Sequence, residues 1–186
     1  MRVRGQEAHA GESAMGPADA VSARVRESLQ QGRPEEAAQL LGHYWAIQAR
    51  VEHGDARGRT VGFPTANMHL DDIDFLAFGT YAVYVNILDD DRSVERHGGV
   101  ASFGIRPMYR TIKPLLGAHL FDFSGDLYGK RLSVELVAWL RLEAVVSRLD
   151  ALIVPIAADA ARVRAILARS HPVRLRDWEG PYLLVD

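Results

Sequence analysis

The middle of the chain alternates hydrophobic and polar positions with the period of a β-strand. In TYAVYVNI, the residues Tyr81, Val83, Val85 and Ile87 fall on one face, which is the pattern of a half-buried antiparallel strand. Other stretches that are rich in aromatic and β-branched residues and bounded by glycine or aspartate are YWAIQARVEH, GGVASFG, GAHLFDF and KRLSVELVAWL. Because no helical pattern separates these stretches, we expect a mainly β domain, either a small barrel or a sandwich.

Helical spacing occurs on both sides of this region. Val21, Val25 and Leu29 recur at the spacing of a helix that Gly32 should end, and PEEAAQLL opens as a helix does, with proline followed by acids. A later stretch, LDALIVPIAADAARVRAILARS, predicts a closing helix. Pro155 should kink it or break it into two pieces, because proline lacks an amide donor and clashes one turn back.

These patterns divide the chain into four expected segments. They are a mobile tail at 1–17, a helical extension at 18–42, the β domain with its closing helix at 43–170, and a C-terminal tail at 171–186. The apolar end of the last tail, from Tyr182 to Val185, is expected to dock on the body.

Composition narrows the class of protein. The 186 residues carry a net charge of −2, 48% are apolar, and none is cysteine, which excludes disulfides and thiolate metal sites. No apolar run is long enough to span a bilayer, and no basic stripe supports nucleic-acid binding. We therefore expect a cytoplasmic protein that acts on small molecules, with no nucleic-acid or membrane partner and an oligomeric state that the sequence leaves open.

The stretch GRTVGFPTAN carries the strongest chemical signal. The Thr65 hydroxyl and the Asn67 side-chain carbonyl are hard oxygen ligands of the kind that Mg²⁺ prefers, and Pro64 fixes the turn before them. On local chemistry alone, a loop that ends in a capping asparagine is the favoured interpretation. Flanking residues that allow close approach of a ligand or could meet phosphate oxygens are Arg57, Gly58, Arg59 and Gly62.

Three further stretches follow in order: GVASFGIRP at 99–107, HLFDFSGDLYGKRLSVELVAWLR at 119–141 and RLDALI at 148–153. Together with GRTVGFPTAN, they resemble the riboflavin kinase domain found as the C-terminal half of bacterial bifunctional FAD synthetases. The resemblance runs from about Tyr44 to Leu167, and residues 21–42 resemble the helical connector that precedes the kinase half. The adenylyltransferase half is expected to be missing, since the chain is short and contains no His-x-Gly-His.

The resemblance implies a six-stranded antiparallel Greek-key barrel with a C-terminal helix. It also implies transfer of the γ-phosphoryl group of ATP to the 5′-hydroxyl of riboflavin, which gives FMN. By the same resemblance, Thr65 and Asn67 hold Mg²⁺ and phosphate, and the segment from Gly54 to Gly62 forms a flap over the phosphates.

One departure bears on catalysis. The family places its general base, a glutamate, two residues before the histidine of the third motif, and this chain has Gly117 there. A positioned base contributes about 10²–10⁴ in rate, so its loss should impair turnover. Carboxylates that could substitute are Asp122, Asp126 and Glu143, although turn, strand-end or surface roles are the simpler interpretation of each.

Two more departures, Met108 and Val146, fall where the flavin is expected to bind, and His119 is interpreted as a structural histidine. Three functions therefore stay open. The first is an Mg²⁺- and ATP-dependent riboflavin kinase with no certain catalytic residue. The others are a non-catalytic flavin or nucleotide binding module and a kinase for a different hydroxylated acceptor.

Overall fold

The computed structural model describes residues 17–52, 64–70, 73–88, 95–105, 114–142, 150–170 and 183–184. Several expected site residues lie outside these ranges: Gly54, Arg57, Gly58, Arg59, Gly62, Met108, Glu143 and Val146. Within the described ranges, no helix combines the length and apolar character that crossing a membrane requires.

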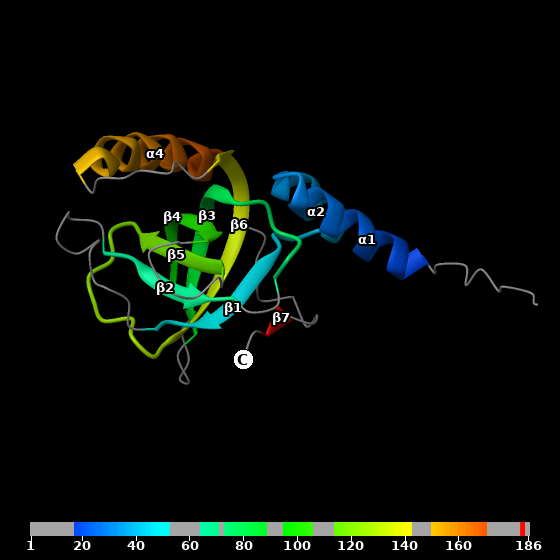
Figure 1. Ribbon diagram of the computed structural model, residues 1–186, viewed down its shortest axis with the longest axis horizontal. Coiled ribbons are helices and arrows are strands. Elements are labelled where there is room, and N and C mark those ends of the chain that lie inside the picture. Colours follow the sequence, from blue (N-terminus) through cyan, green and yellow to red (C-terminus); the bar gives the residue numbers. More distant parts are fainter. Residues whose placement is uncertain are drawn as a thin grey trace, which may run out of the picture.

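Two helices precede the β domain, as expected. They are α1 (Pro17–Gln30) and α2 (Pro34–Leu41). Gly32, with a φ of 68°, lies between them, and Gly42, with a φ of 77°, closes the second by donating its amide to the carbonyl of Ala38. In Figure 1, α1 projects away from the barrel while α2 lies beside it.

The helices share the core of the barrel. Leu29 of α1 and Ala37 of α2 are fully buried in the same apolar cluster as the barrel strands, and the amide of Ala77 donates to the carbonyl of Leu29. The expected boundaries at residues 17, 42 and 170 stay predictions.

The β domain is a nearly closed barrel of six antiparallel strands, which confirms the expected fold class (Figure 1). Neighbouring strands follow the order β2-β5-β4-β3-β6-β1. Between β1 and β2 the described residues make one bridge, Glu52 to Asn67. The strands are β1 (Ala46–Arg50), β2 (Ala66–His69), β3 (Gly79–Leu88), β4 (Glu95–Ile105), β5 (Pro114–Leu120) and β6 (Arg131–Arg141).

Alternation along β3 places its apolar residues inside the barrel. Tyr81, Val83 and Val85 are fully buried and Ile87 is 5% exposed, so the expected inward face is confirmed. The outer face of the same strand is also covered, because Ala82 packs in a second apolar cluster beneath the closing helix.

The closing helix, α4 (Asp150–Arg169), lies across one end of the barrel (Figure 1). It is a single helix, so the prediction that Pro155 divides it in two is wrong. The first four amides of a helix have no intrahelical acceptor, and Pro155 lies in the turn that follows. The missing donor therefore costs one hydrogen bond near the start of the helix, and the helix continues to Arg169.

Two arginine–aspartate pairs attach α4 to the barrel. Arg141 of β6 donates from Nη2 to Asp159 Oδ2 at 2.6 Å and from Nε at 3.1 Å. In the second pair the arginine is on the helix: Arg164 of α4 donates from Nη1 to Asp122 Oδ2 at 2.8 Å and from Nη2 to Asp122 Oδ1 at 3.0 Å. The first pair is largely buried and the second is exposed.

A polar group is buried on the outer face of β3 and β6. Glu135 is 3% exposed and accepts hydrogen bonds from Asn86 Nδ2 at 2.7 Å and from the Arg96 guanidinium. Burial raises the pKa of Glu135 above its ordinary value, and the charge of Arg96 opposes that shift.

The C-terminal tail returns to the barrel. The short strand β7 (Leu183–Leu184) pairs in parallel with β1, Leu183 opposite Ile47 and Leu184 opposite Gln48. These two residues confirm the expected docking of the apolar end.

Candidate functional site

Two of the expected site positions, Asn67 and Gly117, lie on the outer face of β2 and β5. Asn67 of β2 is directly opposite Gly117 of β5, and Gly117 is directly opposite Ser102 of β4. The three positions form a row across neighbouring strands. Their sequence neighbours are buried in the barrel core, which places the row on the outside: Ala66, Met68, Ala101, Phe103, Leu116 and Ala118.

Asn67 has the property that a cation ligand needs. Its side-chain oxygen Oδ1 is buried and has no hydrogen-bond partner among the residues that the structure describes. An unpaired buried carbonyl oxygen is costly unless something binds it. Thr65 lies two positions earlier, immediately before β2, and its side chain is half-buried. The two neutral oxygens therefore fit a hard divalent cation.

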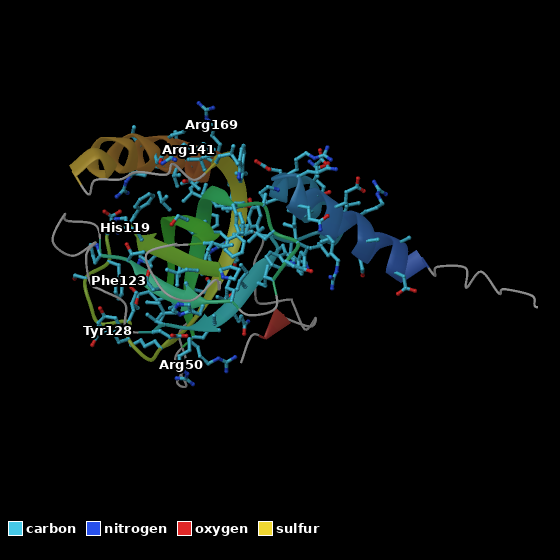
Figure 2. All side chains as sticks on the ribbon, viewed as in Figure 1. Arg50, His119, Phe123, Tyr128, Arg141 and Arg169 are labelled. Atoms are coloured by element: carbon cyan, nitrogen blue, oxygen red, sulfur yellow. The ribbon has the colours of Figure 1, made fainter. Side chains whose placement is uncertain are left out.

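A histidine fixes the turn that leads into this strand. His119 Nδ1 lies 2.9 Å from the carbonyl oxygen of Pro64, and that carbonyl accepts the hydrogen bond. Figure 2 shows His119 on the same side of the barrel as Phe123 and Tyr128. His119 thus ties β5 to the Pro64–Asn67 stretch, which agrees with a structural role.

Two of the carboxylates considered as a replacement for a base at Gly117, Asp122 and Asp126, have other partners. Asp122, with a φ of 55°, is held by Arg164, and the hydrogen bonds from that guanidinium lower the pKa of the Asp122 carboxyl. Asp126 accepts the amide of Tyr128 at 3.0 Å and so stabilises the turn between β5 and β6. Neither carboxylate belongs to the row of Asn67 and Gly117.

The structure adds two residues that the sequence did not point to. Glu52 is the bridge partner of Asn67 on the side away from Gly117, and its amide donates to the Asn67 carbonyl at 2.9 Å. His69, two positions after Asn67, places Nδ1 3.0 Å from Glu52 Oε2. Alternation alone predicts that each faces outward. Their contact could not be predicted, because it depends on how β1 meets β2.

Comparisons with known proteins agree on the family. The riboflavin kinase family model (flavokinase) matches residues 41–167. The bifunctional riboflavin kinase/FMN adenylyltransferase of Escherichia coli K12 is 39% identical over 151 residues, which are 81% of this chain and 47% of that protein. The protein of the same description from Haemophilus influenzae is 39% identical over 144 residues, 77% of this chain and 46% of that protein. The chain thus spans about half the length of the curated relatives it matches.

Solved structures share the fold. A crystal structure described as a macrolide-efflux protein from Streptococcus pneumoniae superposes with a TM-score of 0.68 at 32% identity, over 77% of this chain and 46% of that one. Riboflavin kinase from Trypanosoma brucei superposes with a TM-score of 0.51 at 20% identity, over 67% of this chain and 77% of that one, and shows the fold alone. The family match spans well over half of the sequence, and the chain belongs to the riboflavin kinase family.

Proposed function

We propose that this chain transfers the γ-phosphoryl group of ATP to the 5′-hydroxyl of riboflavin, giving FMN and ADP. The observation that carries the proposal is the buried Oδ1 of Asn67, which no described residue hydrogen-bonds, in a chain of the riboflavin kinase family. The family model covers the barrel and most of α4, and the relatives are named for riboflavin kinase as one of two activities. A cytoplasmic location, expected from the cysteine-free composition, belongs to the same proposal.

Mg²⁺ would be held by Thr65 and Asn67, whose oxygens suit it. The bound ion supplies positive charge that neutralises phosphate oxygens during transfer. The chain's own contribution is position. His119 holds the Pro64 carbonyl, and the pairing of Asn67 with Gly117 fixes the amide on the rigid face of the barrel. The segment from Gly54 to Gly62, with Arg57 and Arg59, is proposed to cover the phosphates.

The proton of the hydroxyl has no assigned acceptor. As the oxygen–phosphorus bond forms and the bond from the γ-phosphorus to ADP breaks, the hydroxyl proton must leave, and Gly117 offers no side chain to take it. Phosphoryl transfer has a loose transition state, so positioning and charge supply much of the acceleration. We therefore expect slow but measurable turnover, with Met108 and Val146 beside the flavin.

Gly117 also favours a second candidate, a flavin and nucleotide binding module that does not turn over. Binding needs the row of Asn67 and its neighbours, whereas catalysis needs a proton acceptor as well. The two candidates therefore predict the same ligands and different products.

The test is FMN formation from riboflavin and ATP with Mg²⁺ by the full chain, alongside riboflavin binding followed by flavin fluorescence. Turnover that disappears when Mg²⁺ is removed, and that falls in Asn67→Ala, supports the kinase. Riboflavin binding without product supports the binding module. Absence of both would overturn the proposal for this acceptor.

A further inference from the structure

Glu52, Asn67 and His69 occupy one compact patch at the seam between β1 and β2. Glu52 and Asn67 are bridge partners, and side chains directly opposite each other have Cβ atoms about 4.5–5.5 Å apart. Val51, Met68 and Leu70 are buried, so the alternating residues Glu52, Asn67 and His69 face outward together. The patch is open to ligands, because the side chains of His69 and Glu52 are 39% and 54% exposed.

The donor spacing in this patch matches that around a metal ion. Two adjacent ligands of an octahedral ion with bonds of about 2.1 Å lie roughly 3.0 Å apart, which is √2 times the bond length. His69 Nδ1 and Glu52 Oε2 are 3.0 Å apart. A cation placed to one side of the line that joins the two atoms, about 2.1 Å from each, can therefore replace the proton they share after the imidazole ring turns toward it.

The third candidate ligand atom is the side-chain oxygen of Asn67. Asn67 Oδ1 is buried and unpaired among the described residues, and its side chain shares this face with Glu52, its bridge partner, and with His69, two positions along β2. Within the described ranges no three His, Cys, Asp or Glu side chains gather at one point, and this patch contains two of them with an amide oxygen. A carboxylate, an imidazole and an amide oxygen together form a mixed oxygen and nitrogen ligand set.

We infer that Glu52, Asn67 and His69 form a divalent-cation site that is filled before nucleotide binds and that prefers a transition metal such as Mn²⁺ to Mg²⁺. The inference extends the cation site on which the proposed function rests. Thr65 and Asn67 alone offer two neutral oxygens and depend on phosphate charge, whereas Glu52 brings a negative charge of its own. The imidazole of His69 supplies the nitrogen ligand that transition metals favour and Mg²⁺ does not.

The experiment is Mn²⁺ binding to the full chain, stripped with chelator and free of nucleotide, measured by loss of the free-ion electron paramagnetic resonance signal. Wild type should bind one Mn²⁺ per chain, and Mg²⁺ should compete only at concentrations at least about tenfold higher. Glu52→Gln and His69→Gln should each weaken Mn²⁺ binding by about 10-fold or more. Thermal melting checks that both variants fold.

The matched control is a second histidine–glutamate contact. His97 Nε2 lies 3.0 Å from Glu95 Oε1, at ion-pair distance but not aligned for a hydrogen bond. Glu95→Gln should leave Mn²⁺ affinity at the wild-type value. The inference is overturned if Glu95→Gln and Glu52→Gln lose Mn²⁺ affinity equally, or if the wild type binds no Mn²⁺.

This readout separates the inference from the proposed function. Mn²⁺ binding that depends on Glu52 and His69 supports the site even if riboflavin is never phosphorylated. An active riboflavin kinase that binds no Mn²⁺ without nucleotide overturns the site and leaves the proposed function in place.

Discussion

Asn67 of β2 and Gly117 of β5 lie directly opposite each other on the outer face of the barrel, so an amide whose oxygen has no partner in the described part of the chain neighbours a position without a side chain. In a riboflavin kinase, this neighbour is where the sequence resemblance places a glutamate. The pairing therefore gives the missing carboxylate a location, one strand away from the proposed cation ligand.

Gly117→Glu should raise FMN formation. A glutamate at this position shares the face of Asn67 and Ser102, so its carboxylate can accept the hydroxyl proton and recover part of the roughly 10²–10⁴ in rate that a base supplies. The measurement is initial rate with riboflavin and Mg-ATP, together with riboflavin affinity. Ser102→Glu places a carboxylate one strand further on and should gain less. A folded Gly117→Glu protein that binds riboflavin but forms FMN no faster than the wild type would contradict the missing-base explanation.

Thr65→Ala and Asn67→Ala should weaken binding of Mg-ADP. Each change removes one oxygen from the proposed cation site and leaves the barrel core intact, because neither residue belongs to the buried apolar cluster. Calorimetric titration with Mg-ADP measures the effect, with Ser124→Ala in the exposed turn after β5 as the control. Unchanged affinity in both variants means that the cation lies elsewhere.

The two arginine–aspartate pairs of α4 should differ in their effect on stability. Asp159→Asn breaks the largely buried pair with Arg141, and hydrogen bonds between charged groups contribute about 2 kcal/mol. The melting temperature should therefore fall by roughly 4–8 °C. Asp122→Asn breaks the exposed pair with Arg164 and should lower the melting temperature less. Equal shifts would show that burial does not set the strength of these pairs.

Glu135 should make stability decrease as pH rises above the ordinary carboxyl range. Its pKa is raised in the folded protein from 4.5, so the folded state binds more protons than the unfolded state in the window from 4.5 up to the raised value. Its contribution to the free energy of unfolding is thus most favourable below 4.5 and is lost as the pH rises through the folded pKa.

Glu135→Gln removes this titration and serves as the reference. Urea unfolding of both proteins between about pH 4 and 7 should show the wild type losing stability relative to the variant as pH rises. A difference that grows in favour of the wild type would mean that the charge of Arg96, and not burial, sets the pKa of Glu135.

The local sequence pattern predicted the helices and strands well, but it predicted less well that the strands close into a barrel. The inward face of β3, the end of α1 before Gly32 and the start of α2 follow from periodicity, glycine and proline, and the docking of β7 follows from its apolar residues, all of which are local signals. A barrel could not be separated from a sandwich in this way, because the difference lies in which distant strands meet. The error at Pro155 arose from treating proline as equally disruptive everywhere, whereas its cost depends on its distance from the helix start.

The candidate site likewise contains residues that the sequence could identify and a contact that it could not. The motif that contains Thr65 and Asn67, and the glycine at 117, could be recognised from order and spacing along the chain. The contact of Glu52 with His69 could not be predicted. It forms only where the two ends of the strand order, β1 and β2, meet as the barrel closes.

The place where the barrel closes is also the place where its local unfolding is expected to begin. Within the described residues, β1 and β2 are joined by the single bridge of Glu52 to Asn67, whereas β3 is paired along its length on both sides. Local unfolding begins where the backbone is least paired, so amide hydrogen exchange should be faster at this seam than in the centre of β3. A ligand held by residues of both strands opposes the opening in proportion to its occupancy. The exchange rate of the Glu52 amide should then report whether the site is filled, without any need for the ligand to have a colour or a product.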